Sequence, residues 1–93
     1  MMNQAIQFDN ELAISENSVM FNAQQSGQVL PCIIGFDVLS QLAQLTGSEQ
    51  VDVVNADNAA ALFELLRFDI EDLAETLIKQ ERVNDAGEVI INC

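Results

Sequence analysis

The chain has 93 residues, nearly half of them apolar, and it sets 15 carboxylates against three cations for a net charge of −12. It contains no histidine, tyrosine or tryptophan, so the residue that most often serves acid–base catalysis and metal binding is missing. Nucleic acids and anionic membrane surfaces are polyanionic and would repel such a chain. We therefore expect no direct contact with nucleic acid and no membrane contact, whereas a basic protein partner stays possible.

Residues 1–93 fit a single domain, because a chain of this length buries roughly 60–70% of its unfolded surface in one core. The N-terminus lacks the cationic segment and the long apolar run of a secretory signal, and the longest apolar stretch, Val29–Ile34, is too short to cross a bilayer. A cytoplasmic location is predicted. In that reducing compartment Cys32 and Cys93 are expected to stay free thiols.

Three strands are predicted in the first third of the chain. Residues 5–8 alternate weakly, residues 11–17 show no clear period, and residues 18–23 place Val19, Phe21 and Ala23 on one face. The third strand, Val29–Ile34, is nearly all apolar, which predicts a strand covered on both faces.

One glycine and one proline refine this prediction. Gly27 allows the positive φ of a hairpin turn between the second and third strands. Pro31 has no N–H to donate to a neighbouring strand, so it is expected at a sheet edge or a bulge.

Helical spacing follows. A first helix is predicted over Phe36–Thr46 and can end at Gly47. Residues 48–58 fit a loop or a brief extra strand. A second, long helix is predicted from about Asp57, its N-cap, to Arg82. Its apolar stripe comprises Ala59, Leu62, Phe63, Leu66, Ile70, Leu73, Ala74 and Leu77.

The unbroken stripe favours one continuous helix, straight or bent. The alternative is a break near Phe68, with Asp69 capping a second segment. A last strand over residues 88–91 follows a turn at 84–87. The order β-β-β-α-α-β predicts an α+β domain, in which a small, mostly antiparallel sheet packs against two helices, the second one long.

Cys32 is the first candidate for chemistry. A reactive thiolate needs a nearby cation or a helix N-terminus, and the chain has no histidine to pair with it. Cys32 also shares a strand face with Leu30 and Ile34, so a buried structural thiol is the favoured interpretation.

The dense carboxylates Asp69, Glu71, Asp72 and Glu75 form the second candidate. They could hold a divalent cation, serve acid–base chemistry or face a basic partner. A solvated helix face is favoured, because paired carboxylates act as acid and base only in a cleft that separates their pKa values. We predict no catalytic residue, no metal ligand and no cofactor.

Arg67 lies at the edge of the apolar stripe, with Glu64 and Glu71 at helical spacings of three and four residues. We predict a structural ion pair among these three residues, with the arginine stem half buried. Anion binding is the alternative, but no second cation lies close in sequence to share the anion.

Phe68 points away from the main stripe together with Ala61 and Leu65, so the helix is apolar almost all round in this region. The second face is explained by cover from the first helix, by a bend or by a protein interface. We name Ala61, Leu65 and Phe68 as a possible interface, for a homodimer or for another partner.

The pattern as a whole resembles a small bacterial family catalogued as domain of unknown function 1488. The matching residues are Met2, Asn3, Gln4, Ile6, Phe8, Val19, Phe21, Gly27, Leu30, Cys32, Ile34, Leu39, Phe63, Arg67, Ile70, Glu71, Ala74, Gly87 and Val89. The departures are the lack of a tryptophan near Leu12 and a glycine at position 35 where related chains tend to have serine. The resemblance implies a compact α+β domain in a bacterial cytoplasm and no established activity.

These observations favour a non-catalytic cytoplasmic interaction or regulatory domain that self-associates or binds a protein partner. Two rival hypotheses remain. One is an acidic mimic that blocks a basic nucleic-acid-binding surface of another protein; its complexes would weaken steeply with salt. The other is a small carboxylate- or metal-dependent enzyme, which would require a deep pocket that holds perturbed acids.

Overall fold

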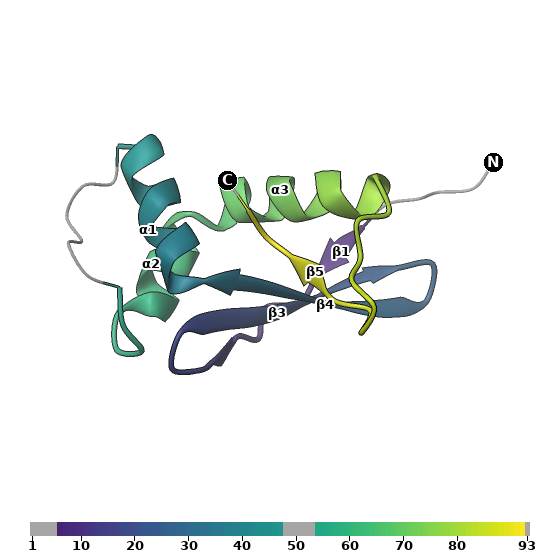
Figure 1. Cartoon of the computed structure of the whole chain (residues 1–93), viewed down its shortest axis with the longest axis horizontal. Helices are drawn as coiled ribbons and strands as arrows, with labels where there is room; N and C mark the ends of the chain where they lie inside the picture. Colours follow the sequence, from purple (N-terminus) through teal and green to yellow (C-terminus); the bar gives the residue numbers. More distant parts are fainter. Residues whose placement is uncertain (1–5, 48–53, 93) are drawn as a thin grey trace.

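The computed structural model describes residues 6–47 and 54–92, which form one sheet packed against helices (Figure 1). In chain order the elements are β1 (Gln7–Phe8), β2 (Ala13–Ile14), β3 (Ser18–Gln25), β4 (Gln28–Gly35), α1 (Phe36–Leu45), α2 (Ala59–Leu65), α3 (Arg67–Lys79) and β5 (Val89–Ile90). The predicted α+β class with a mostly antiparallel sheet is confirmed. Its detailed order differs, since four strands precede the helices and the long second helix is two helices.

The strand order across the sheet is β1-β3-β4-β5, and β2 pairs with the same edge of β3 as β1 does. Gln7 of β1 is opposite Gln24, and Ala13 of β2 is opposite Met20. Strand β2 was absent from the predicted order because only two residues of the stretch 11–17 pair, too few for a visible period. β5 runs parallel to β4, because the chain returns through the helices before it joins the sheet.

The β3–β4 hairpin is closed by Ser26 and Gly27, whose φ values are 53° and 81°. Positive φ at both central residues defines a type I′ turn, in which glycine is favoured. Along the hairpin, hydrogen-bonded residue pairs alternate with pairs that share no hydrogen bond, starting from the bonded pair Gln25–Gln28 beside the turn. By this alternation Pro31 and Asn22 share no hydrogen bond. Its missing N–H therefore faces the other edge, where pairing with β5 starts only at Cys32. Pro31 is thus paired with β3 but precedes the residues of β4 that pair with β5.

The core lies between one face of the sheet and the helices. Val19, Phe21 and Ala23 of β3 are buried there as predicted, and the Phe21 ring meets the Phe63 ring edge to face at 5.0 Å between centroids. The expectation that Val29–Ile34 is covered on both faces is wrong. Cys32 and Ile34 are buried, but Val29 on the opposite face is 57% exposed.

The helices follow the predicted periodicity, but the long second helix is interrupted and its N-cap differs from the prediction. Helix α1 ends at Leu45, one residue before the predicted end, and Gly47 follows with φ 83°. The continuous helix is interrupted at Leu66, two residues before the alternative break near Phe68. Leu66 takes φ −104° and ψ 12°, and its N–H is shared between the carbonyls of Leu62 and Phe63. The interruption inserts no residue, so the buried stripe continues through it.

The predicted cap Asp57 does not close the start of α2. The Asn55 side chain instead accepts the N–H groups of Asp57 at 2.9 Å and Asn58 at 3.1 Å, and the Asn58 side chain accepts the Asn55 N–H. This reciprocal pair resembles a capping box. Residues 48–53, part of the segment predicted as loop or strand, lie outside the described residues.

Candidate functional site

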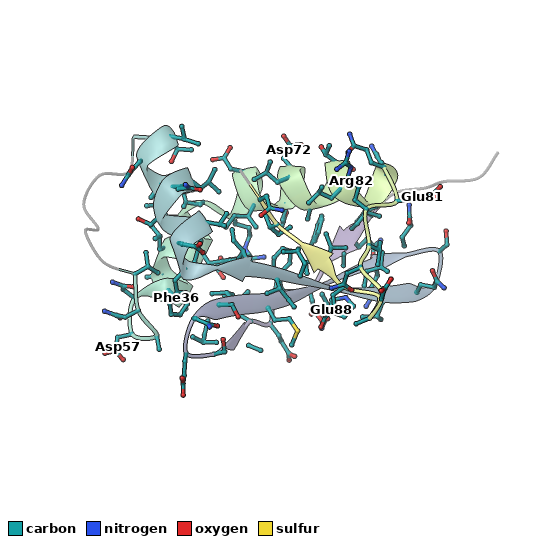
Figure 2. The ribbon with its side chains drawn as sticks, in the orientation of Figure 1. Phe36, Asp57, Asp72, Glu81, Arg82 and Glu88 are labelled. Atoms are coloured by element: carbon teal, nitrogen blue, oxygen red, sulfur yellow. The ribbon has the colours of Figure 1, made fainter. Side chains whose placement is uncertain are left out.

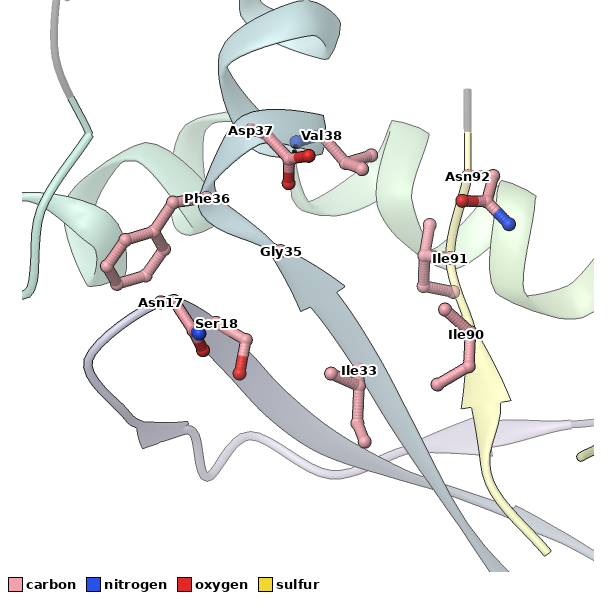
Figure 3. Close-up of a pocket in the computed structure, with 10 residues that line it drawn as sticks. All are labelled: Asn17, Ser18, Ile33, Gly35, Phe36, Asp37, Val38, Ile90, Ile91 and Asn92. Carbon is pink, nitrogen blue, oxygen red and sulfur yellow. Dashed lines mark hydrogen bonds between the residues drawn. The ribbon is translucent and has the colours of Figure 1, made fainter. Parts of the chain in front are cut away.

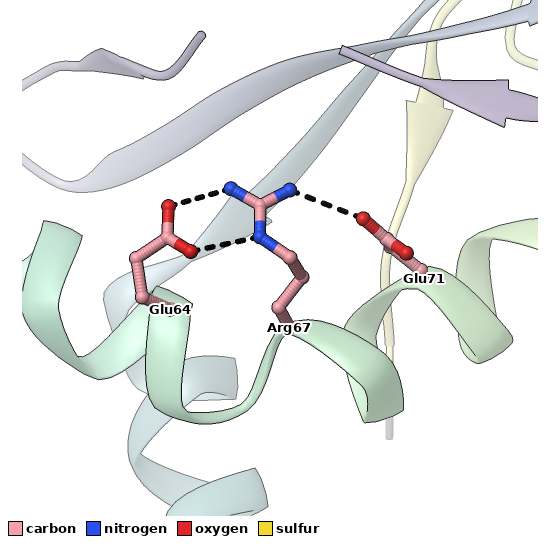
Figure 4. A network of polar contacts seen from close by, with 3 residues as sticks. All are labelled: Glu64, Arg67 and Glu71. Carbon is pink, nitrogen blue, oxygen red and sulfur yellow. Dashed lines mark hydrogen bonds and ion pairs between the residues drawn. The ribbon is translucent and has the colours of Figure 1, made fainter. Parts of the chain in front are cut away.

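Arg67 joins the two helices at the Leu66 interruption (Figure 4). From the first position of α3 its Nη2 and Nε donate to the two carboxylate oxygens of Glu64 at 2.6 and 2.8 Å, and its Nη1 donates to Glu71 at 3.1 Å. The guanidinium also lies 5.2 Å from the centre of the Phe63 ring. All three nitrogen groups are engaged, so the arrangement braces α2 against α3 rather than offering a free anion site.

The brace holds the pKa of Glu64 below its ordinary value of 4.5, chiefly through the hydrogen bond from Arg67, and raises the pKa of Arg67 above its already high value for the same reason. A lowered carboxyl pKa stabilises the folded state above pH 4.5, and this contribution is lost as the pH falls through the lowered folded-state value.

We therefore expect Glu64→Gln to destabilise the protein relative to wild type at pH 7 and to do so less at pH 3, where the ion pair contributes less. Urea unfolding at both pH values measures the difference. Asp72→Asn removes the same charge from a carboxylate without an ion pair among the described residues and controls for net charge. An equal deficit for Glu64→Gln at both pH values would contradict the role given to the ion pair.

Cys32 is a core residue. Its side chain is fully buried, and burial raises the pKa of the thiol to about 12. The sulfur donates weakly to the Leu30 carbonyl at 3.5 Å. A thiol that stays protonated and out of contact with solvent does not act as a nucleophile, so the structure supports the buried interpretation.

A groove of about 480 Å³ runs between β1 and α3, and we call it the Phe68 groove. It is lined by Ile6, Phe8, Phe68, Asp69, Glu71, Asp72 and Glu75. Phe68 is 86% exposed, the largest exposed fraction among the large hydrophobic side chains of the described chain. Ala61 and Leu65 are also exposed, Leu65 by 68%, but neither lines the groove. The predicted interface set is therefore divided: Phe68 faces the groove, and Ala61 and Leu65 lie outside it.

The four carboxylates of the groove are not equivalent. Glu71 bonds Arg67, and Glu75 lies 3.5 Å from the ammonium of Lys79. Asp69 and Asp72 are exposed and form no ion pair within residues 6–47 and 54–92. In the same residues no three metal-ligating side chains come close enough to hold a metal ion. The groove therefore presents two unpaired negative charges beside an exposed aromatic ring.

A second hollow, of about 600 Å³, opens where β4 passes into α1 and where β5 ends (Figure 3). Ile33 and Ile90 form part of its wall, with Phe36 and Asp37 from the start of α1. The Asp37 carboxylate accepts the Val38 N–H at 2.9 Å. A Cβ at position 35 would lie 2.5 Å from this carboxylate, so any residue larger than glycine there requires the exposed Asp37 side chain to move.

The sequence interpretation missed the face of the sheet opposite the helices. On this face Met20 is 38% exposed and Ile90 is 43% exposed. The period of two in β3, which assigned Val19 and Phe21 to the core, also assigns Met20 to the other face. The position of Met20 could therefore have indicated an exposed apolar face. It was not used, because Val29–Ile34 was predicted to be covered on both faces.

No helix in the described part of the chain has the length and apolar character needed to span a membrane. A comparison with curated proteins finds no match.

Two further comparisons agree with each other. The family model described as "Protein of unknown function (DUF1488)" matches residues 6–91. Among solved structures, the chain is similar to the crystal structure of a protein of unknown function from the DUF1488 family of Shewanella loihica PV-4. The two share 39% identity with a TM-score of 0.81, over 99% of this chain and 97% of the other. The chain therefore belongs to the DUF1488 family, for which no function is established.

Proposed function

We propose that the chain is a non-catalytic cytoplasmic interaction domain whose Phe68 groove binds a positively charged segment of a protein partner. The observation that carries the proposal is an aromatic ring left 86% exposed in a groove lined by four carboxylates. The buried free thiol of Cys32 suits a reducing compartment.

The ring supplies the apolar part of the binding energy. Full burial of a phenylalanine side chain is worth about 1.5–3 kcal/mol relative to full exposure, and nearly all of that is unused at Phe68. Phe8 and Ile6 are already half-buried beside it, so a bulky aliphatic side chain of the partner would meet an existing apolar floor.

The carboxylates select the charge of the partner. Asp69 and Asp72 have no ion-pair partner among the described residues, and the chain as a whole carries −12. A lysine- or arginine-rich segment is therefore attracted over about 10 Å and gains ion pairs on arrival. A second copy of this chain would instead set its own carboxylates against these, so the groove is poorly suited to self-association.

The test is a titration by fluorescence anisotropy with two labelled peptides of equal charge, one of lysine and leucine and one of lysine and serine. We expect the lysine–leucine peptide to bind more tightly, to weaken with salt, and to lose about 10-fold in affinity in Phe68→Ala. Leu65→Ala removes an exposed side chain outside the groove and should leave the affinity unchanged.

Two outcomes would reject the proposal. If Phe68→Ala binds the lysine–leucine peptide as tightly as wild type does, the ring has no role. If both peptides bind alike and only salt affects them, charge alone is at work, as expected of an acidic mimic of nucleic acid.

A further inference from the structure

The sheet has one face packed against α3 and another face with no described helix over it (Figure 1). Cross-strand pairing shows what lies on that second face. Ala13 is opposite Met20, Met20 is opposite Ile33, and Ile33 is opposite Ile90. These four side chains form a continuous apolar row across β2, β3, β4 and β5. We call them the sheet row.

The same face carries no charge on its strands. None of the residues in β1, β2, β3, β4 or β5 is charged, although the chain contains 15 carboxylates. The carboxylates within the described residues lie in the helices and in the segments that connect the elements. Asp72, for example, stands on α3 (Figure 2). Asp9 and Glu88 lie next to strand ends, and Asp9 continues the pairing of β1 by donating its N–H to the Asn22 carbonyl at 2.9 Å. These two carboxylates place negative charge at the margin of the face.

This distribution decides which occupant fits the face. Two copies of a chain with a net charge of −12 repel each other wherever their carboxylates approach within about a Debye length, roughly 10 Å at 0.1 M salt. Contact through the uncharged face keeps the α3 carboxylates of the two copies on opposite outer sides of the pair. A basic partner would find no charge complement on the strands, whereas an identical uncharged face is complementary to it.

The face has both a hollow and a protruding side chain, which could interlock with those of a second copy. Ile33 and Ile90 of the sheet row border the 600 Å³ hollow at the end of β4 (Figure 3). Met20 protrudes nearby with a flexible, unbranched side chain of the kind that adapts to irregular gaps. A second copy related by a twofold axis presents the same protrusion and the same hollow, which is the requirement for an isologous interface.

We infer that the uncovered face of the sheet binds a second copy of this chain, sheet against sheet, with the sheet row at the centre of the interface. The two central strands are each eight residues long and extend about 26 Å, so the face is small. A reversible dimer is expected, because stable pairs bury at least about 1,000 Å² and a face of this size offers little more.

The dimer and the groove use opposite layers of the molecule, so either can fail without the other. They also respond to salt with opposite signs. Salt screens the carboxylates at the margin of the sheet face and strengthens the dimer, but it weakens a cationic peptide in the Phe68 groove.

Sedimentation equilibrium of the full chain at low and high salt tests the inference. We expect a monomer–dimer equilibrium that tightens with salt, and a weakening of at least about 30-fold in Ile90→Glu and in Met20→Glu, because each places a like pair of charges in the interface. Both positions are partly exposed in the single copy, so the variants are expected to fold, and circular dichroism verifies this. Phe68→Glu is the matched control on the helical layer.

An independent readout is the Met20 methyl resonance, which should shift on dilution of the wild-type protein. A wild-type protein that stays monomeric at high concentration and high salt, with an unchanged Met20 resonance, would overturn the inference. So would a dimer that dissociates in Phe68→Glu but persists in Ile90→Glu.

Discussion

Replacing Phe63 with alanine is expected to lower the free energy of unfolding by about 3–5 kcal/mol. The Phe63 side chain is fully buried, its ring contacts that of Phe21, and the Arg67 guanidinium lies over it. Truncation therefore opens a cavity and removes the surface on which the brace between α2 and α3 rests. Small domains are stable by only about 5–15 kcal/mol, so this loss removes a large share of the total stability.

Urea unfolding followed by circular dichroism measures this loss. Phe68→Ala makes the same chemical change at a site that is 86% exposed, and it should alter stability by no more than about 0.5 kcal/mol. Equal losses in the two variants would mean that the packing of Phe63 has been misassigned.

Reversing the two unpaired charges of the Phe68 groove, in the double variant Asp69→Lys with Asp72→Lys, is expected to weaken lysine–leucine peptide binding by about 100-fold or more. The same variant should gain affinity for a glutamate–leucine peptide, because Phe68 remains while the charge beside it changes sign. Anisotropy titrations with both peptides measure the exchange.

The matched control for this exchange is Asp57→Lys with Asp85→Lys. It makes the same change in net charge at two exposed positions outside the groove. If the control variant loses as much affinity as the groove variant, the attraction is a property of the whole acidic surface and has no local site.

The sequence predicts the fold class because two periods are clear in it. Alternation places Val19, Phe21 and Ala23 on one face of a strand, and the structure buries all three. Spacings of three and four residues place Leu62, Leu66 and Ile70 on one buried stripe. Both signals arise from burial, so they identify the covered surfaces well.

Structural features that leave the spacing of buried residues unchanged cannot be predicted from that spacing. The interruption at Leu66 changes one residue's backbone angles without adding or removing a residue, so the stripe reads as continuous. Strand β2 has only two residues, both exposed. The capping role of Asn55 depends on side-chain hydrogen bonds, and Asp57, two residues further along, is by residue type an equally good candidate.

The candidate surfaces were predictable to different degrees. The contacts of Arg67 with Glu64 and Glu71 follow from helical spacing, since both partners lie within one turn. The Phe68 groove could not be derived, because Ile6 and Phe8 come from the other end of the chain and reach α3 only through the sheet. The sheet row required the register of four strands, which a single sequence does not provide.

The central claim is that a cationic segment binds at the Phe68 groove, and nuclear magnetic resonance tests it most directly. Adding the lysine–leucine peptide to isotope-labelled protein should shift the amide and side-chain resonances of Ile6, Phe8 and residues 68–75, while those of Met20 and Ile90 stay unchanged. Shifts confined to the sheet face, or spread evenly over all acidic residues with Phe68 unmoved, would contradict the claim.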